Sequence, residues 1–185
     1  MIEKEYKFLV SYQDFKNIFN KITVIFKNTN YKRKSILQVN YYYDTSDLFL
    51  YKNNITYRIR QKDNNLQKQI KIKEFGNKYQ KAVEHSENIK SIKKNYMFSM
   101  NFNNQKKDLS TELIGNLITK RESFFINDIR IDFDKNLYLG KCDYEIEIEF
   151  QNDIENEILS LFDNFNTNNE GKYKRFINTY LSLGE

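Results

Sequence analysis

The sequence predicts a mainly β fold with helices packed around the sheet, and three observations support this prediction. Charged and apolar residues alternate near the start, where Glu3, Glu5 and Lys7 occupy every second position. The same alternation returns in residues 141–150, where the charged positions on one face are carboxylates. Several stretches between these two carry Lys or Arg at the same spacing. Side chains two residues apart share one face of a β-strand, so each stretch indicates a strand with a charged face.

The elements follow in order from the residue spacing. We expect strands at 2–8, 36–44, 56–62, 66–75, 78–85, 119–126, 128–135 and 141–150, with hairpin turns at Gly76-Asn77 and Asn127-Asp128. Ser11 followed by Asp14 predicts the start of a helix, because apolar residues then recur at helical spacing. We expect further helices at 87–100, at 108–118, at 153–165 and after Gly171, while residues 22–32 are compatible with another strand.

Length and composition favour one domain that binds a small anion. The chain has 185 residues, which is enough for one domain with a real core. Lys and Arg number 30 against 25 Asp and Glu, which gives a net charge of +5 with the charges interspersed. This balance permits an anionic ligand and does not require a nucleic acid, so we expect no specific nucleic-acid partner.

The start of the chain and its single cysteine indicate a cytoplasmic protein. Charged residues interrupt the first ten positions, so we expect no signal peptide. No apolar run reaches the roughly 18–20 residues that span a bilayer, so we expect no membrane segment. Cys142 is alone, which excludes an internal disulfide, and its position on the apolar side of a strand predicts a buried residue.

The repeated charged faces are the functional signal. A single strand with alternating charges is usually the solvated face of an antiparallel sheet. Here several strands repeat the pattern, and their opposite faces are strongly apolar. A closed sheet would place one face inside, where unpaired charges are expensive. A divalent metal held by carboxylates, together with phosphates held by Lys and Arg, would bridge an acidic and a basic wall.

The ordered set of motifs resembles a known family. The motifs are Glu3-x-Glu5-x-Lys7, Tyr42-Tyr43-Asp44-Thr45, Arg58-x-Arg60 and Glu145-x-Glu147-x-Glu149. Together they resemble the CYTH superfamily, also called triphosphate tunnel metalloenzymes, over nearly the whole chain. The resemblance implies a closed eight-stranded antiparallel β-barrel tunnel with helices packed outside. It also implies a triphosphate substrate and Mg²⁺ or Mn²⁺ as the cofactor.

The resemblance assigns roles to individual residues. The implied metal ligands are Glu3, Glu5, Asp132, Glu145, Glu147 and Glu149. The implied substrate-binding residues are Lys7, Arg58, Arg60, Lys71, Lys73, Arg121, Arg130 and Lys172, with Glu147 and Lys73 as catalytic residues. Gly171-Lys172 resembles the Ser-Lys pair of the family, with Gly in place of Ser. The sequence leaves open whether Glu84 and Tyr42 face the same interior.

We therefore expect a metal-dependent hydrolase that releases phosphate from a linear triphosphate. The substrate would be inorganic tripolyphosphate or an organic triphosphate such as thiamine triphosphate or a nucleoside triphosphate. Two alternatives stay open: a class IV adenylate cyclase that makes cyclic AMP from ATP, and a polyphosphate- or nucleotide-binding module without turnover. The sequence does not decide the substrate, the preferred metal or the oligomeric state, for which a homodimer is one option.

Overall fold

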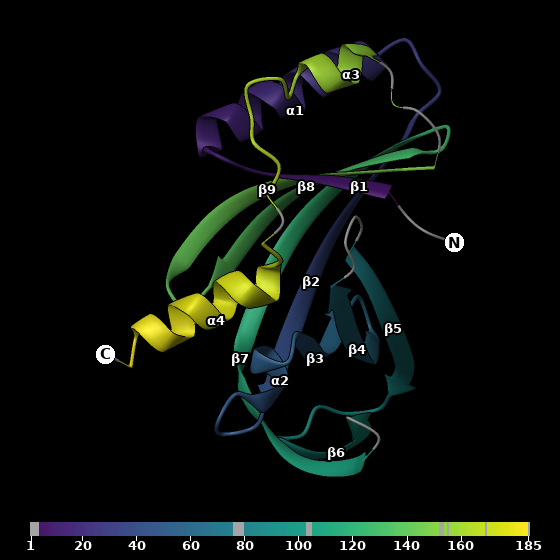
Figure 1. Cartoon of the computed structure of the whole chain (residues 1–185). Helices are drawn as coiled ribbons and strands as arrows, with labels where there is room; N and C mark the ends of the chain where they lie inside the picture. Colours follow the sequence, from purple (N-terminus) through teal and green to yellow (C-terminus); the bar gives the residue numbers. More distant parts are fainter. Residues whose placement is uncertain are drawn as a thin grey trace. The chain divides into compact units, whose positions relative to one another are not determined.

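The computed structural model describes residues 4–75, 80–102, 105–151, 154, 156–168 and 170–184. The strands are β1 (Lys4–Val10), β2 (Lys32–Asp44), β3 (Ile55–Lys62), β4 (Asn65–Phe75), β5 (Gln80–Ile89), β6 (Asn95–Phe102), β7 (Gln105–Ile126), β8 (Ile129–Tyr138) and β9 (Lys141–Phe150) (Figure 1). The helices are α1 (Tyr12–Phe26), α2 (Phe49–Lys52), α3 (Asn156–Ser160) and α4 (Lys172–Ser182). No helix among these residues is long and apolar enough to cross a membrane.

The strands form an open antiparallel sheet and not the predicted closed barrel. In the described residues the hydrogen-bonded order is β1-β9-β8-β7-β2-β3-β4-β5, and β6 pairs with β7 beside this path. The path ends at β1 on one side and at β5 on the other, so the prediction of a closed eight-stranded barrel is wrong. The mainly β, antiparallel character is confirmed. Alternation along one strand tells which side chains share a face, but it does not tell whether the two outermost strands meet.

The chain divides into two compact units, which are described separately. Unit 1 comprises Met1–Leu37 and Ile118–Gly171, and unit 2 comprises Gln38–Leu117 and Lys172–Glu185. Strands β2 and β7 each run from one unit into the other. The prediction of a single functional domain stays a prediction.

The core of unit 1 lies between the apolar face of its sheet and helices α1 and α3. Figure 1 shows both helices on the same side of β1, β8 and β9. Phe8, Phe133 and Ile146 from the strands pack with Ile22 of α1 and Ile158 of α3 in one buried cluster. Covering one face of the sheet in this way leaves the opposite face for the polar residues, which alternate with the apolar ones.

Helix α1 begins where the sequence predicts and continues further than expected. The Ser11 hydroxyl accepts a hydrogen bond from the Asp14 backbone N–H at 3.1 Å, which confirms the predicted cap. Ile18, Ile22 and Phe26 follow on the buried face. The alternative of a strand over residues 22–32 is wrong for its first part, because the apolar helical spacing extends to Phe26.

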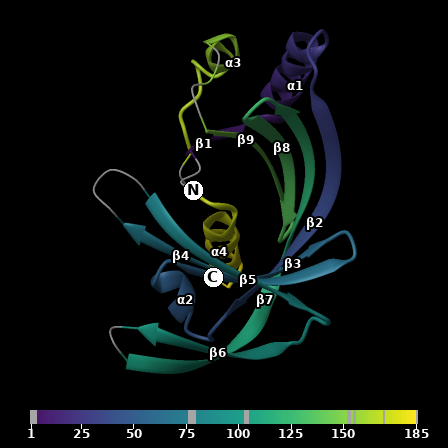
Figure 2. The ribbon, with the colours of Figure 1, turned by 90° about the vertical axis from the view of Figure 1, so that its right-hand side faces the viewer.

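Unit 2 contains two segments whose predicted structure is wrong. Residues 87–100 and 108–118 were expected to be helical, but they belong to β5, β6 and β7, and Figure 2 shows β6 beside β7. Tyr96, Phe98 and Met100 occupy every second position and pack into the core of this unit. This period of two is the pattern of a half-buried strand and not of a helix.

The connections and the C-terminal elements follow the predictions more closely. Asn127 has a φ of 50° in the β7–β8 turn, and Gly140 has a φ of 77° in the β8–β9 turn. These left-handed conformations suit Asn and Gly in tight hairpins. Helix α4 follows Gly171 as expected, but α3 is shorter than the predicted 153–165 helix. Cys142 is exposed, so its predicted burial is wrong.

Candidate functional site

The polar face of the unit 1 sheet gathers the predicted residues of β1, β7, β8 and β9 in cross-strand rows. The backbone registers define four rows, namely Glu5–Glu149–Arg130–Phe125, Lys7–Glu147–Asp132–Ser123, Leu9–Glu145–Asp134–Arg121 and, without β1, Asp143–Asn136–Thr119. Residues directly opposite one another on neighbouring strands lie close enough to interact. The polar side chains that alternate along each strand therefore form one cluster across the sheet once the strands pair.

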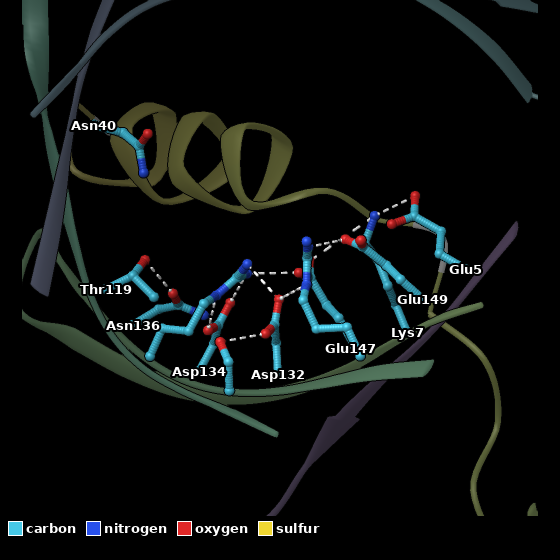
Figure 3. A network of polar contacts seen from close by, with 12 residues as sticks. Glu5, Lys7, Asn40, Thr119, Asp132, Asp134, Asn136, Glu147 and Glu149 are labelled. Atoms are coloured by element: carbon cyan, nitrogen blue, oxygen red, sulfur yellow. Dashed lines mark hydrogen bonds and ion pairs between the residues drawn. The ribbon is translucent and has the colours of Figure 1, made fainter. Parts of the chain in front are cut away.

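Arg121 is the centre of this cluster. Its guanidinium donates two hydrogen bonds of 2.6 Å to the two carboxylate oxygens of Asp134. It also contacts Asp132 at 2.5 Å and Glu147 at 2.6 Å, so three carboxylates surround one cation (Figure 3). Only 14% of the Arg121 side chain is exposed. The planar guanidinium suits such a paired arrangement, and its charge-assisted hydrogen bonds are stronger than hydrogen bonds between neutral groups.

Arg130 and Lys7 pair with the carboxylates nearer the start of β1. Arg130 donates to Asp132 at 3.1 Å and also forms an ion pair with Glu149. The Lys7 ammonium lies 2.6 Å from Glu5 and 3.9 Å from Glu147. Arg121 and Arg130, which were expected on a separate basic wall, thus lie among the carboxylates of unit 1.

Hydrogen bonds from uncharged side chains also orient residues of the cluster. The Ser123 hydroxyl donates to Asp132 at 2.6 Å, and Thr119 donates to the Asn136 side chain at 2.7 Å. The Asn136 amide in turn donates to Asp143 at 2.9 Å. Such hydrogen bonds orient the side chains, because they satisfy atoms that the sheet has removed from water.

Burial and charge shift two groups of the cluster in the same direction. Burial works against the charged form of Arg121, but its hydrogen bond to Asp134 and the charges of Asp134, Glu147 and Asp132 outweigh burial and raise its pKa. Burial also raises the pKa of Asp132, and the nearby Arg121, Ser123 and Arg130 offset this only in part. Arg121 therefore stays a firmly held cation.

Among the described residues, two sets of three carboxylates are close enough to share a metal ion. Asp132, Glu147 and Glu149 form one set, and Asp134, Glu145 and Glu147 form the other, with one oxygen from each member within 4.8 Å of the others. Glu147 belongs to both sets. All the donor atoms are oxygens, which is the chemistry that Mg²⁺ and Mn²⁺ prefer.

The charge balance of this face also fits a bound cation. Its described carboxylates are Glu5, Asp132, Asp134, Asp143, Glu145, Glu147 and Glu149, and its described cations are Lys7, Arg121 and Arg130. Several of these carboxylates are buried, and a buried negative charge needs a compensating positive one. The donor set and the excess of carboxylates together fit a divalent metal.

Unit 2 carries the remaining predicted cations on β3, β4 and α4. The Arg58 guanidinium donates to the Gln69 side chain at 2.8 Å, and Arg60 donates to Asn40 at 3.0 Å. Lys71 on β4 and Lys172 at the start of α4 are partly buried. The strand registers place Asn40 opposite Arg60, and Gln69 opposite Arg58, so amide side chains orient both guanidinium groups.

The remaining predicted residues have different outcomes. Glu3 and the side chains of Lys73 and Glu84 lie outside the described residues, so their expected roles stay predictions. Tyr42 is fully buried in unit 2, packed against α4.

Sequence reasoning left Asp134 and Ser123 out of the site. Asp134 continues the alternation of Arg130 and Asp132, so its spacing carried the signal. Ser123 follows Arg121 at the same spacing, but a serine gives no charge signal.

Comparisons with known proteins show which solved structures share this fold. A solved structure of a candidate adenylate cyclase from Bacillus halodurans has a TM-score of 0.67 and 24% identity, over 95% of this chain and 97% of that chain. The candidate adenylyl cyclase HpAC1 from Hippeastrum has a TM-score of 0.60 and 16% identity, over 96% of both chains. The PH1819 protein from Pyrococcus horikoshii has a TM-score of 0.58 and 15% identity, over 96% of this chain and 99% of that chain. The TM-scores show a shared fold, and at these identities the likeness shows the fold alone.

The family itself is established from the sequence. No curated protein matches the chain. A family model described as the CYTH domain matches residues 1–177, which is nearly the whole length. The ordered carboxylate and cation motifs on the polar strand faces are consistent with this match. The chain therefore belongs to the CYTH domain family.

Proposed function

We propose that this CYTH protein is a divalent-metal-dependent hydrolase that releases phosphate from a linear triphosphate. The observation that carries the proposal is the polar face of unit 1, where two overlapping sets of three carboxylates lie beside Arg121, Arg130 and Lys7. Carboxylates alone would suffice for a metal, and cations alone would suffice for an anion. Both kinds together suit a metal–phosphate substrate.

The metal ligands that we propose are the carboxylates of β1, β8 and β9. They are Glu5, Asp132, Glu145, Glu147 and Glu149, with Glu3 from the sequence motif and Asp134 added by the structure. A divalent cation bound there would neutralise phosphate oxygens and favour a nucleophilic water. Mg²⁺ and Mn²⁺ both fit the oxygen donors.

The cations of the chain would bind the phosphate oxygens. Arg121 and Arg130 present planar guanidinium groups, which can hold two oxygens at once, and Lys7 adds a compact charge on β1. Further phosphate contacts that we propose from the family motifs are Arg58, Arg60, Lys71, Lys73 and Lys172, with Lys73 as a catalytic cation. These groups would stabilise the charge that spreads over the transferring phosphoryl group.

Glu147 is the residue that we propose to orient the attacking water. Its carboxylate belongs to both carboxylate sets and contacts Arg121. A hydrogen bond from the water to Glu147 would point the oxygen lone pair at the terminal phosphorus. The water oxygen then forms the new P–O bond, and the bridging P–O bond breaks and releases the shortened phosphate chain, while the proton lost by the water passes to the phosphate products or to solvent.

Hydrolysis is favoured over cyclisation by one comparison. The candidate adenylyl cyclase from Hippeastrum is described as having a dominant triphosphatase activity. It shares this fold over 96% of both chains. The fold therefore accommodates hydrolysis in a protein first assigned as a cyclase. Formation of cyclic AMP by the present chain would be the signature of the cyclase alternative.

The test is a substrate panel with the variant Glu147→Gln. We expect wild type to release phosphate from tripolyphosphate or an organic triphosphate in Mg²⁺ or Mn²⁺, without cyclic AMP. Glu147→Gln keeps the side-chain size but removes the charge, and we expect turnover to fall by about 10²–10⁴-fold.

Glu122→Gln is the matched control. Glu122 pairs with Arg33 at 3.2 Å, and its position on β7 alternates with that of Arg121, so it lies on the other face. We expect this variant to keep the wild-type rate. A Glu147→Gln protein with near-wild-type turnover would remove Glu147 from the site, and cyclic AMP as the main product would replace the hydrolase by a cyclase.

A further inference from the structure

Tyr42 holds a buried hydroxyl that has no hydrogen-bond partner. Its side chain is 0% exposed, and its hydroxyl oxygen is one of the buried polar atoms left unpaired among the described residues. A buried hydroxyl normally finds a partner, since leaving it unpaired costs folding free energy. A ligand that binds beside the hydroxyl is one way to supply the missing partner, and the surroundings of the hydroxyl decide whether a ligand fits.

The surroundings of Tyr42 within unit 2 are strongly cationic. Tyr42 lies opposite Arg58 on the neighbouring strand. Its ring packs against Tyr173 at 4.8 Å and Phe176 at 5.1 Å between ring centroids, and both residues belong to α4. Burial raises the pKa of Tyr42, while the positive charges of nearby groups lower it in part; these groups are Arg58, Lys172, Arg60 and Arg175.

Helix α4 is fixed against β2 at this point. The Tyr173 hydroxyl donates to the buried Asp44 carboxylate at 2.8 Å. Lys172 and Arg175 both belong to the first turn of α4, and the helix is eleven residues long. Its first backbone N–H groups and their dipole favour a negative charge, as the two side chains do.

We propose that the Tyr42 hydroxyl donates a hydrogen bond to a phosphoryl oxygen of the substrate, at an anion site that β2, β3 and the first turn of α4 form within unit 2. Arg175, which no family motif pointed to, adds its charge to that of Arg58, Arg60 and Lys172. A phosphoryl oxygen supplies the acceptor that the hydroxyl lacks, and its negative charge is attracted by the positive charges around Tyr42. This inference deepens the proposed function and rests on it.

Tyr57 provides a matched comparison. Its ring is also fully buried in unit 2, and its hydroxyl is also unpaired. It neighbours Arg58 in sequence, so it points to the opposite face of β3, where it packs against Tyr43 and Phe98. The charge effects on the pKa of Tyr57 come from Tyr96, Tyr43 and Glu87 and not from a cation.

The experiment compares Tyr42→Phe with Tyr57→Phe in binding and in stability. Tripolyphosphate is titrated by calorimetry into each protein in the presence of EDTA, and melting curves are recorded without ligand. We expect Tyr42→Phe to bind about tenfold or more weakly, because a hydrogen bond to a charged acceptor is lost. We expect Tyr57→Phe to bind within about twofold of wild type. Without ligand, neither variant should melt below wild type, since each change removes an unpaired buried hydroxyl.

Each outcome separates this inference from the proposed function. Tyr42→Phe binding like wild type, or Tyr57→Phe losing as much affinity, overturns the inference and leaves the hydrolase standing. A loss of affinity together with a melting point several degrees below wild type overturns it too, because the hydroxyl would then be structural. Affinity that depends on Tyr42 without any turnover in Mg²⁺ or Mn²⁺ supports the anion site and overturns the hydrolase. No tripolyphosphate binding by wild type overturns the anion site, while the substrate panel decides the hydrolase, because an organic triphosphate is also a proposed substrate.

Discussion

At Arg121, one guanidinium contacts carboxylates that belong to both of the proposed metal-binding sets. Asp134 and Glu147 are members of one set, and Asp132 and Glu147 are members of the other. The side chain is largely buried, so its positive charge offsets negative charges that water cannot screen. Arg121 therefore has two tasks that compete, since it neutralises the carboxylates and is also a proposed phosphate contact.

We predict that Arg121→Met destabilises the protein in EDTA by about 3–5 kcal/mol, because removing one partner of a buried ion pair leaves uncompensated charges. Added Mg²⁺ should then raise the melting temperature of this variant more than that of wild type, since the ion takes over the role of the guanidinium. Denaturant unfolding in EDTA and thermal melting with and without Mg²⁺ measure both effects.

Lys68→Met serves as the control for this prediction. Lys68 pairs with Glu87 at 2.9 Å, and 63% of the Glu87 side chain is exposed. Exposed pairs of this kind contribute at most about 1 kcal/mol. Equal destabilisation of the two variants, or an equal response to Mg²⁺, would contradict the role of Arg121 as the counter-charge of the cluster.

At the scale of single elements, the packing of β7 against α4 requires a glycine at residue 115. Gly115 has a φ of 151°, which L-residues rarely adopt. A Cβ atom at this position would lie 2.7 Å from Cζ of Phe176, a ring of α4 that is fully buried. The close approach of β7 and α4 within unit 2 therefore excludes a side chain at residue 115.

We predict that Gly115→Ala lowers the free energy of unfolding by about 2–4 kcal/mol, through backbone strain and overpacking together. Gly140→Ala is the control, because Gly140 also has a positive φ, of 77°, but nothing lies within 4 Å of its added Cβ. That variant should lose only about 1–2 kcal/mol from the left-handed conformation. Denaturant unfolding measures both, and equal losses would show that the contact with Phe176 contributes nothing.

At the scale of the whole molecule, the chain carries a modest net positive charge. The net charge of +5 hides local differences, because the unit 1 face has an excess of carboxylates while β3 carries Arg58, Arg60 and Lys62. A polyanion that binds only the folded state should relieve repulsion among such cations and stabilise the protein by mass action.

We predict that tripolyphosphate at a hundred times its Kd stabilises the protein by about 2.7 kcal/mol, which raises the melting temperature by about 5–11 °C for a chain of this size. Orthophosphate should shift the melting temperature far less, because one phosphate group contacts fewer cations. Equal shifts for the two anions would mean that no extended triphosphate site exists.

Two variants on the same strand face refine this prediction. Arg58→Ala should shrink the tripolyphosphate shift more than Lys62→Ala does. The Arg58 side chain is partly buried and held by Gln69, whereas Lys62 is exposed at the end of β3. A larger effect of Lys62→Ala would contradict the proposed binding residues on β3.

The candidate site of unit 1 was largely predictable from the sequence. Period-two alternation assigned Glu5 and Glu147 to charged strand faces, the family resemblance added Arg121, and the structure brings these residues onto one face. The cap at Ser11 was equally readable, because the cap and the helix it starts are neighbours in sequence. The helix predicted over residues 87–100 was wrong at β6, where Tyr96 and Phe98 are spaced for a strand.

The sequence by itself determined the family, the strands that carry charge and the residue types of the site, because these depend on local spacing and side-chain chemistry. Only the tertiary structure decided that the sheet stays open, that Arg121 lies among three carboxylates, and that the Tyr42 hydroxyl is buried beside α4. These features depend on which strands and helices become neighbours. That choice arises from hydrogen bonding and packing between residues far apart in the chain, and the spacing of residues within one strand does not encode it.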